Sequence, residues 1–369
     1  MKILQIGMGN MAGGLEAFVM NYYRVLAVMD VEFDFLCMYP KIAYEEEILR
    51  LGGHVFYVPN VKKDYFGYIK GLKKILDNGR YTAVHVNMLS AANIVPLRVA
   101  SRYPGLHVIA HSHNSSCPGF VRNMMDRVNK RKLPRFATDY FTCSPAAGTW
   151  MFGKQMQESG KVHKICNAVR LSDYSFSAQE RKFFRDEFMW QDKLVIGHVG
   201  RFELQKNHTG MIGIFEELVK KEPDAVLCLI GSKDCLYPEI LQLVREKGLE
   251  DNVYFTGARS DVGRLLSAMD VFLFPSLFEG APFALVEAQA NGLPCVISNV
   301  ISSETDVLPE QIRRLPLEDA PQKWAEAVLD AAKTGRAEQE RIETKMAECH
   351  FDISTEAERL KKIYQDMES

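Results

Sequence analysis

Two carboxylates, Glu279 and Glu287, lie within one short stretch of the sequence, "FPSLFEGAPFALVEAQANGLPCVIS", which spans residues 274–298. The residues after Pro282 predict a short helix that is apolar on almost every side, and such a helix should be buried. An ionised carboxylate in the middle of this helix costs several kcal/mol unless another group satisfies it. The first question that the sequence raises is therefore what Glu287 binds.

The two carboxylates can face the same site. Glu279 falls in the loop after a strand expected over residues 271–275, Pro282 suits the first helical turn, and Glu287 lies about one turn into the helix. The backbone N–H groups of residues 281–286 point outward from the helix start and can hold an anion such as a phosphate. A capping role for Glu279 and solvation of Glu287 would explain either residue alone. The two together, with the closing "NGLP", favour a ligand site.

A second set of candidates follows the strand expected over residues 194–200. Arg201 and Lys206 come at the carboxyl end of this strand, on a loop that leads into a helix over residues 208–218. Two cations beside a helix N-terminus suit the charge of a diphosphate. Because surface Arg and Lys are common, the argument depends on their placement.

Glycines follow the first expected strand in "GMGNMAGGLEAF". Gly13 and Gly14 permit close approach of the backbone to a ligand. The spacing of the glycines does not satisfy the dinucleotide fingerprint G-x-G-x-x-G, so a simple turn into a helix explains the pair equally well.

Two histidines, His111 and His113, come at the end of a strand expected over residues 107–113. Side chains at i and i+2 of a strand point to the same face and could ligate a metal ion. No neighbouring carboxylate or cysteine completes such a site. Hydrogen bonding to a polyhydroxylated substrate or to the loop backbone is the favoured interpretation.

Two segments are locally basic, although the chain as a whole has a formal charge of −2 and therefore no general attraction to nucleic acid or to an anionic membrane. The segment Arg122–Arg135 carries six cations against one aspartate, and the segment Lys62–Lys74 carries five lysines interleaved with three aromatic residues. Cations with aromatics suit the surface of an anionic bilayer. A solvated charged face is the alternative explanation.

The elements that position these residues alternate between short strands and helices, in two series. Such alternation predicts an α/β protein with two doubly wound, Rossmann-like domains. We place a first domain at residues 1–170, a second at residues 171–350 and a C-terminal helix at residues 351–369, after an irregular connection. Open parallel sheets bind ligands at the carboxyl ends of their strands, so we expect the site in a cleft between the domains. The strands are expected over residues 2–7, 31–38, 54–59, 83–87, 107–113, 139–144, 194–200, 225–231, 253–257, 271–275 and 294–298.

The compartment follows from the cysteines and the hydropathy. The eight cysteines of this chain of 369 residues are widely spaced and include no C-x-x-C pair, which fits a reducing cytoplasm. The N-terminus lacks the apolar core of a signal peptide, and no window reaches the roughly 18 apolar residues of a spanning helix. We expect a cytoplasmic protein, with any membrane contact peripheral.

The motifs resemble those of a known enzyme family. "GGLEAFVMNYYRVL", "GRFELQKNH", "FTGARSDV" and the stretch from Met269 to Ser298 look like the retaining glycosyltransferases of the GT-B fold, group 1 or family 4. The similarity extends from the N-terminal glycines to about Ser298 and is most specific at the E-x7-E element of Glu279 and Glu287. In this fold the last helix crosses back to the first domain.

The resemblance implies roles for the candidate residues. Glu287 would bind the ribose hydroxyls of a nucleotide sugar, and Glu279 would face the donor sugar. His113 would contact the sugar, although the sequence leaves open whether His111 or His113 does so. Of the other positions, Arg201 and Lys206 would hold the diphosphate, Phe283, Ala284, Leu285 and Val286 would add N–H donors, Gly231, Ser232, Arg259 and Ser260 would surround the base, and Gly13 and Gly14 would approach the phosphates.

The activity implied is transfer of a sugar from a nucleoside diphosphate donor, UDP being favoured, to a hydroxyl acceptor with retention at the anomeric carbon. A lipid-linked saccharide of surface polysaccharide synthesis is the expected acceptor, and neither a metal nor another cofactor is expected. The alternatives are a nucleotide-sugar epimerase or hydrolase of the same fold and a noncatalytic nucleotide-sugar-binding protein. Two departures from the family pattern, Asn207 in place of a frequent glycine and the run "CNAVRLSDY", leave the charged residues unchanged.

Overall fold

The computed structural model describes residues 1–114, 117 and 119–368, and it divides into two compact units. The N-terminal unit comprises Met1–Ala168 together with the chain from Ile353 onward, and the C-terminal unit comprises Val169–Asp352. The sequence-based boundaries were 170 and 351, and Ser369, the last residue of the predicted C-terminal helix segment, lies outside the described residues. The two units are described separately.

The N-terminal unit is built on a seven-stranded parallel sheet with the strand order β3-β2-β1-β4-β5-β6-β7. The central strands β4 and β5 are buried almost throughout, as expected of parallel strands that are covered by helices on both faces. The strands are β1 (Lys2–Ile6), β2 (Glu32–Cys37), β3 (Val55–Tyr57), β4 (Ala83–Met88), β5 (His107–Ser112), β6 (Asp139–Thr142) and β7 (Val162–Lys164).

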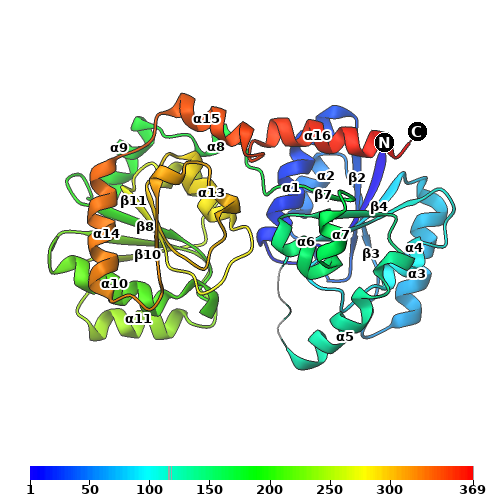
Figure 1. Ribbon diagram of the computed structural model, residues 1–369, viewed down its shortest axis with the longest axis horizontal. Coiled ribbons are helices and arrows are strands. Elements are labelled where there is room, and N and C mark those ends of the chain that lie inside the picture. Colours follow the sequence, from blue (N-terminus) through cyan, green and yellow to red (C-terminus); the bar gives the residue numbers. More distant parts are fainter. Residues whose placement is uncertain (115–116, 118, 369) are drawn as a thin grey trace. The chain divides into compact units, whose positions relative to one another are not determined.

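The C-terminal helix α16 (Ile353–Asp366) belongs to the N-terminal unit and packs on α1 (Gly14–Leu26) (Figure 1). It buries Ile353, Ala357, Leu360 and Tyr364, whose spacing defines one face of an α-helix. The other helices of this unit are α2 (Glu45–Arg50), α3 (Tyr65–Gly79), α4 (Val95–Ala100), α5 (Phe120–Lys130), α6 (Pro145–Phe152) and α7 (Lys154–Glu158), with the short 3-10 turns η1 (Ala27–Met29) and η2 (Leu133–Arg135).

The C-terminal unit repeats this plan with a six-stranded parallel sheet in the order β10-β9-β8-β11-β12-β13. The strands are β8 (Val195–Val199), β9 (Val226–Ile230), β10 (Val253–Gly257), β11 (Val271–Phe274), β12 (Cys295–Ser298) and β13 (Ile312–Leu315). The helices are α8 (Leu171–Tyr174), α9 (Ala178–Glu187), α10 (His208–Val219), α11 (Tyr237–Glu246), α12 (Val262–Leu266), α13 (Phe283–Ala290), α14 (Pro321–Thr334) and α15 (Gln339–Glu348), with the 3-10 turns η3 (Leu204–Lys206), η4 (Ser303–Thr305) and η5 (Pro309–Gln311).

The predicted fold class, two doubly wound α/β domains, is confirmed, but four elements were missed. β7 and β13 are edge strands of three and four residues with little apolar character, so the sequence gives them weak signals. The prediction of an irregular connection before the last helix was wrong, because α14 and α15 occupy it. α14 buries Trp324, Ala325 and Val328 on one face and lies against α10 and the sheet.

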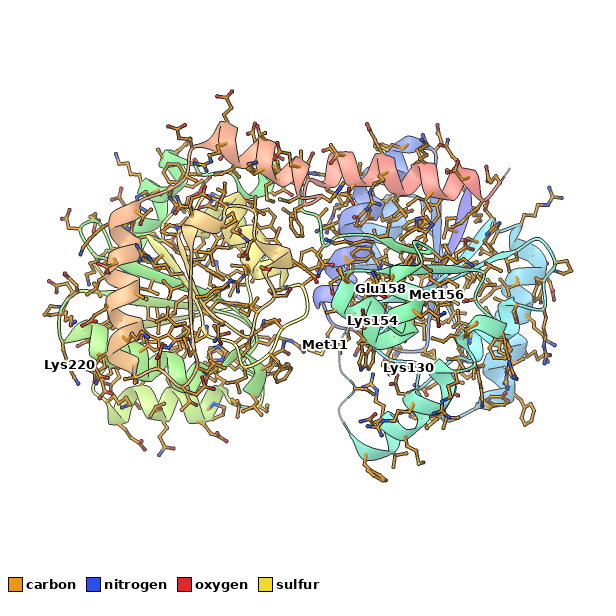
Figure 2. The ribbon with its side chains drawn as sticks, in the orientation of Figure 1. Met11, Lys130, Lys154, Met156, Glu158 and Lys220 are labelled. Carbon is orange, nitrogen blue, oxygen red and sulfur yellow. The ribbon has the colours of Figure 1, made fainter. Side chains whose placement is uncertain are left out.

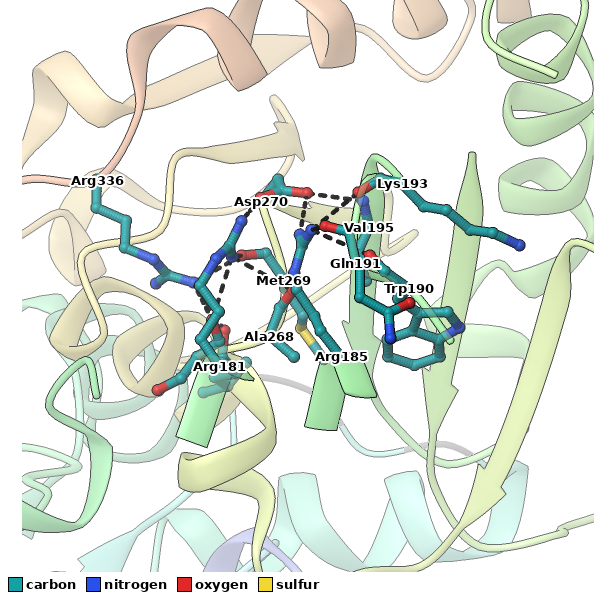
Figure 3. Close-up of polar contacts among 12 residues, drawn as sticks. Arg181, Arg185, Trp190, Gln191, Lys193, Val195, Ala268, Met269, Asp270 and Arg336 are labelled. Atoms are coloured by element: carbon teal, nitrogen blue, oxygen red, sulfur yellow. Dashed lines mark hydrogen bonds and ion pairs between the residues drawn. The ribbon is translucent and has the colours of Figure 1, made fainter. Parts of the chain in front are cut away.

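Three arginines hold the turn between α12 and β11, the strand that leads to Glu279 (Figure 3). Arg181, Arg185 and Arg336 donate hydrogen bonds to the carbonyl groups of residues 266–269. The carboxylate of Asp270 accepts from Arg181 and Arg185 at 2.6 Å each. Burial lowers the pKa of Arg336 to about 9. These bonds satisfy carbonyl groups that the end of a helix leaves without partners.

Candidate active site

The predicted ligand-binding residues of the C-terminal unit lie on α13 and on four loops at one edge of the sheet. Because the strand order is β10-β9-β8-β11 and all strands are parallel, the loops that follow these strands are neighbours. The loops meet directly, since Gly200 N–H donates to Ile230 O at 2.8 Å and Leu277 N–H donates to Gln205 O at 2.8 Å. The loop residues are Arg201 and Lys206 after β8, Gly231 and Ser232 after β9, Arg259 and Ser260 after β10, and Glu279 after β11.

Lys206 and Glu279 form an ion pair at this edge of the sheet. Lys206 Nζ lies 2.6 Å from Glu279 Oε1, and Gln205 Nε2 donates to the other carboxylate oxygen at 3.0 Å. The side chains are 17% and 6% exposed, so the pair is largely removed from water. Lys206 Nζ also lies 4.7 Å from the centroid of the Phe274 ring. The sequence predicted both residues as site residues, and the structure brings them into contact.

Asn207, the departure from the frequent family glycine, has a structural explanation. Its backbone is left-handed, with φ of 54°, a region that asparagine adopts more readily than most residues. Its side chain caps α10 by accepting a hydrogen bond from Gly210 N–H at 3.3 Å and donates to Pro275 O at 3.0 Å. Asn207 therefore ties the Lys206 loop to the loop that carries Glu279.

Glu287 is the fifth residue of α13, and a tyrosine hydroxyl donates a hydrogen bond to its carboxylate. Tyr174 Oη donates to Glu287 Oε1 at 2.9 Å, and Tyr174 O accepts from Asn291 Nδ2 at 2.6 Å. Burial raises the pKa of Glu287 from 4.5 to about 7, while the Tyr174 hydrogen bond and the charge of Lys206 act in the opposite direction. Within the described residues, Glu287 forms no ion pair.

Sequence reasoning missed Tyr174. It lies in "CNAVRLSDY", which was noted only as a departure from the family pattern, and it reaches Glu287 because α8 packs on α13. The signal that could have found it is the requirement that a buried carboxylate be hydrogen-bonded. The sequence could not name the donor, because the two residues are 113 positions apart.

The start of α13 offers two of the four predicted N–H donors. The N–H groups of Leu285 and Val286 donate to Pro282 O at 3.2 Å and 3.4 Å. The side chains of Leu285 and Val286 are also fully buried. Helix geometry leaves the two preceding N–H groups, those of Phe283 and Ala284, without an intrahelical acceptor. These two groups are the ones that can receive an anion.

The remaining residues of this edge are positioned by their neighbours. Arg201 Nη1 lies 2.9 Å from Glu203 Oε1, and its side chain is 52% exposed. A Cβ atom on Gly231 would lie 2.0 Å from Gly200 O, so only glycine fits there. Ser232 Oγ donates to Asp234 Oδ2 at 2.5 Å.

Arg259, the cation predicted beside the base, donates hydrogen bonds from Nε and Nη2 to the carboxylate of Asp261. The two distances from its guanidinium nitrogens to the Asp261 oxygens are 2.7 Å and 2.6 Å. This pairing raises the pKa of Arg259. The guanidinium also lies 5.6 Å from the centroid of the Phe184 ring. Asp261 thus fixes the planar group at the loop after β10, next to Ser260.

In the N-terminal unit, the two predicted glycines begin α1. Gly13 is the residue before the helix and Gly14 is its first residue. A Cβ atom on Gly13 would lie 2.9 Å from Glu16 Oε2, whereas one on Gly14 would meet no atom within 4 Å. Glu16 accepts a hydrogen bond from Gly9 N–H at 2.8 Å, which closes the loop between β1 and α1. A Cβ atom at position 13 would meet only the flexible end of the Glu16 side chain, so the approach of Gly13 to a ligand stays a prediction.

His111 and His113 have different surroundings. His111 is fully buried, and its Nδ1 lies 2.9 Å from His85 Nε2. His113 is half-buried, and its Nε2 lies 2.9 Å from Asn87 Oδ1. Burial lowers the pKa of both histidines, that of His113 to about 3. Of the two residues, His113 is the one that is partly accessible to solvent. Over the described residues, no group of three or more His, Cys, Asp or Glu side chains is arranged to hold a metal ion.

The fold and this set of residues define a two-domain α/β enzyme with a charged site at the carboxyl edge of a parallel sheet, and comparisons with known proteins identify the class. Residues 12–173 match the family described as Glycosyltransferase Family 4, and residues 179–347 match Glycosyl transferases group 1. The chain is 34% identical to EpsF of Bacillus subtilis (strain 168), a protein whose name describes it as a glycosyltransferase, over 98% of this chain and 96% of that protein. The chain belongs to this glycosyltransferase family.

Two further comparisons extend the likeness. The UDP-Gal:alpha-D-GlcNAc-diphosphoundecaprenol alpha-1,3-galactosyltransferase of Escherichia coli is 24% identical over 81% of this chain and 79% of that enzyme. The crystal structure of Anabaena Alr3699/HepE in complex with UDP-glucose superimposes with a TM-score of 0.79 at 19% identity, covering 99% of each chain. The predicted family and an enzyme of the glycosyltransferase class are thereby confirmed.

Proposed function

We propose that this glycosyltransferase moves a hexose from a UDP-sugar to a hydroxyl group of a lipid-linked saccharide, with retention at the anomeric carbon, in the synthesis of a surface polysaccharide. The observation that carries the proposal is the contact of Lys206 with Glu279 beside Glu287 at one sheet edge. A cation, a carboxylate and a hydroxyl-binding carboxylate in one place suit the diphosphate, the sugar and the ribose of such a donor. The UDP-glucose complex of HepE and the diphosphoundecaprenol acceptor of the E. coli enzyme support the choice of nucleotide and acceptor.

The proposed reaction breaks the bond between the anomeric carbon and the phosphate oxygen and forms a bond from the same carbon to the acceptor oxygen. The acceptor proton passes to the departing phosphate oxygen on the same face of the sugar, and UDP leaves. Negative charge that develops on the diphosphate is stabilised by Lys206, Arg201 and the N–H groups of Phe283 and Ala284. Each well-placed donor of this kind lowers a barrier by about 3 kcal/mol. Glu279 faces the positive charge that develops on the sugar.

In this proposal the fixed cations take the place of a divalent metal. We therefore expect transfer to proceed at an unchanged rate after dialysis against EDTA, because the diphosphate charge is already balanced by side chains and helix N–H groups. Addition of Mg²⁺ or Mn²⁺ after dialysis is the control. A loss of turnover that is restored by one of these ions would contradict metal independence.

The first test of the proposed function is a thermal-shift panel of nucleotide sugars. A donor that binds the folded protein raises the melting temperature, and we expect UDP-sugars to do so more than GDP-sugars. The second test is turnover with a polyprenyl-diphosphate-linked sugar as acceptor, with the anomeric configuration of the product determined by NMR. Inversion of configuration would refute retention.

Two further outcomes separate this proposal from its alternatives. Donor consumption without acceptor would indicate a hydrolase or epimerase. Glu279→Gln, which retains the shape of the side chain and removes its charge, should abolish transfer and retain UDP binding. Transfer at the wild-type rate in this variant would contradict the role of Glu279.

The proposed lipid-linked acceptor implies contact with a membrane. Helix α5 supports this contact, because its apolar side is exposed and its polar side faces the protein. The exposed side carries Phe120, Val121, Met124, Met125 and Val128, a stripe with helical spacing, and Phe120 is 86% exposed. Figure 1 shows α5 at the periphery of the N-terminal unit. An exposed apolar stripe of this size marks an interaction surface.

The polar side of α5 faces the protein instead. Asp126 is 1% exposed and accepts a hydrogen bond from Ala91 N–H at 2.7 Å, and Asn129 Nδ2 donates to Ala91 O at 2.9 Å. Lys130, labelled in Figure 2, lies 2.8 Å from Asp126 and 3.2 Å from the centroid of the Trp150 ring. Lys130 therefore holds the helix in place, and the basic residues that remain exposed are Arg122, Arg127, Arg131, Lys132 and Arg135.

An apolar stripe flanked by exposed arginines complements an anionic bilayer. The exposed Phe66 and the exposed lysines of the segment Lys62–Lys74 supply a second region of the same character. None of the helices within the described ranges has the length and apolar character needed to cross a bilayer. We propose that the protein binds the inner face of the plasma membrane peripherally through α5.

Sedimentation with vesicles tests the membrane proposal. The wild type should bind vesicles of phosphatidylcholine with phosphatidylglycerol more strongly than vesicles of phosphatidylcholine alone. Met124→Glu combined with Val128→Glu should release it, whereas Val28→Glu with Leu49→Glu, at exposed apolar residues elsewhere in the same unit, should not. Equal binding by all three proteins would contradict the role of α5.

A further inference from the structure

Behind His113 lies a buried cluster of polar side chains on one face of the N-terminal sheet. Gln5 on β1 pairs in register with His85 on β4, and Asn87 on β4 pairs with His111 on β5. Residues two apart on a strand point to the same face, so the five side chains from Gln5 to His113 share it. Gln5, His85, Asn87 and His111 are each less than 5% exposed. A polar cluster this deeply buried has to arrange every donor toward an acceptor.

The orientation of the Asn87 amide is fixed by a backbone carbonyl group. Asn87 Nδ2 lies 3.4 Å from Ile6 O and 2.9 Å from Gln5 Oε1. A backbone carbonyl oxygen only accepts, so the NH₂ group of Asn87 must face it. The amide oxygen of Asn87 is then the atom that lies 2.9 Å from His113 Nε2. Gly7 lets the chain after β1 approach the backbone of β4 at Asn87, because a Cβ atom there would lie 2.2 Å from the backbone carbonyl oxygen of Asn87.

The amide oxygen determines which nitrogen of His113 carries the proton. An amide oxygen only accepts hydrogen bonds, so Nε2 of His113 must be the donor. Because burial lowers the pKa of His113 to about 3, the ring is neutral near neutral pH and has a single N–H group. Nδ1 therefore carries a lone pair and acts as a hydrogen-bond acceptor. Asn87, which is 4% exposed, acts on a ligand only through its neighbour His113, a residue that is partly accessible to solvent.

We propose that Asn87 is a positioning residue that holds His113 as the tautomer protonated at Nε2, so that Nδ1 accepts a hydrogen bond from a hydroxyl group of the donor sugar. This inference rests on the proposed function, since it concerns how the sugar of the nucleotide sugar is recognised. It states which partner of this hydrogen bond is the donor and which is the acceptor. The ligand supplies the donor, which a sugar hydroxyl can do and an ether or carbonyl oxygen cannot.

A second chain of hydrogen bonds, which reaches the Asn87 amide only at Nδ2 through Gln5, provides the control. Tyr364 Oη on α16 lies 2.7 Å from His85 Nδ1, and His85 Nε2 lies 2.9 Å from His111 Nδ1. Among the described residues, Nε2 of His111 has no hydrogen-bond partner. These bonds link the C-terminal helix to the sheet without including Asn87 Oδ1. Tyr364→Phe should therefore lower stability and leave the tautomer of His113 unchanged.

NMR of the full chain labelled with ¹⁵N-histidine measures the tautomer directly. We expect His113, identified by comparison with His113→Gln, to show a protonated Nε2 and a bare Nδ1 in the absence of ligand. Addition of UDP-glucose should move the Nδ1 resonance upfield, as a new hydrogen bond to this atom requires, and addition of UDP should not. A proton on Nδ1, or an Nδ1 resonance that UDP-glucose binding does not move, would overturn the proposal.

Binding by variants gives a second measurement. Asn87→Leu removes the acceptor for Nε2–H, and the resulting loss of one oriented hydrogen bond should weaken UDP-glucose binding about fivefold to tenfold while UDP binding is retained. Tyr364→Phe should lower the melting temperature and weaken neither ligand. Equal weakening of UDP and UDP-glucose by Asn87→Leu would assign Asn87 a structural role only. If Asn87→Leu does not fold, the NMR measurement on the wild type decides. A protein that binds no nucleotide sugar would overturn the proposed function together with this inference.

Discussion

Replacing Glu287 by glutamine should stabilise the protein in the absence of ligand while it weakens donor binding. Burial raises the pKa of Glu287 from 4.5 to about 7, so the folded protein holds this proton more tightly than the unfolded chain does. A difference of about 2.5 between the two pKa values corresponds to about 3 kcal/mol. The wild type carries almost none of this cost below pH 4.5, and the cost grows as pH rises until it is complete above about pH 7. Glutamine has nearly the same shape, remains neutral and still accepts the hydrogen bond from Tyr174.

Thermal melts of the ligand-free proteins measure this effect. At about pH 8 we expect Glu287→Gln to melt roughly 5 to 10 °C above the wild type, and at about pH 5 the gain should fall to a few degrees. Glu250→Gln, at an exposed glutamate of the same unit, is the matched control and should shift neither melt.

Calorimetric titration with UDP-glucose completes the test of this variant. Loss of hydrogen bonds between the ribose hydroxyls and a charged acceptor should weaken binding roughly 10- to 100-fold. If Glu287→Gln were no more stable at the higher pH than at the lower, the pKa argument would fail. If it bound UDP-glucose as tightly as the wild type, the ribose role of Glu287 would fail instead.

Two further predictions concern Tyr174 and Asp270. The Tyr174 hydroxyl lowers the pKa of Glu287, so Tyr174→Phe should raise that pKa. As pH is lowered, Glu287 of the variant then becomes protonated at a higher pH than in the wild type, and its UDP-glucose affinity begins to fall there. An unchanged pH profile of calorimetric affinity would contradict this. Asp270→Ala leaves the buried Arg185 without its carboxylate and should lower the free energy of unfolding by about 3–5 kcal/mol in urea titrations. Asp330→Ala, which breaks an exposed pair with Lys333, is the control and should cost under about 1 kcal/mol.

The fold could be predicted from the sequence where strands are buried on both faces. Strands such as β9 and β11 are continuous apolar runs that alternate with helices, and this local pattern is sufficient to indicate two parallel sheets. β7 and β13 lie at sheet edges and have one neighbour each, so their pairing depends on the sheet and leaves little trace in composition. The helices α14 and α15 bury one face each and are otherwise polar, so their composition resembles that of an irregular connection.

Within the site, the sequence by itself determined the residue types that a charged donor requires and the loops on which they lie. Glu279, Lys206 and Glu287 were named because a carboxylate in an apolar helix and cations at strand ends are costly or distinctive in any fold.

Only the tertiary structure decided which of these groups meet. The contact of Lys206 with Glu279, the hydrogen bond from Tyr174 to Glu287 and the amide of Asn87 against His113 join residues 73, 113 and 26 positions apart. The physical reason is that hydrogen bonds and ion pairs act over a few ångströms, and the sequence does not encode such distances until the sheets bring their strand ends together.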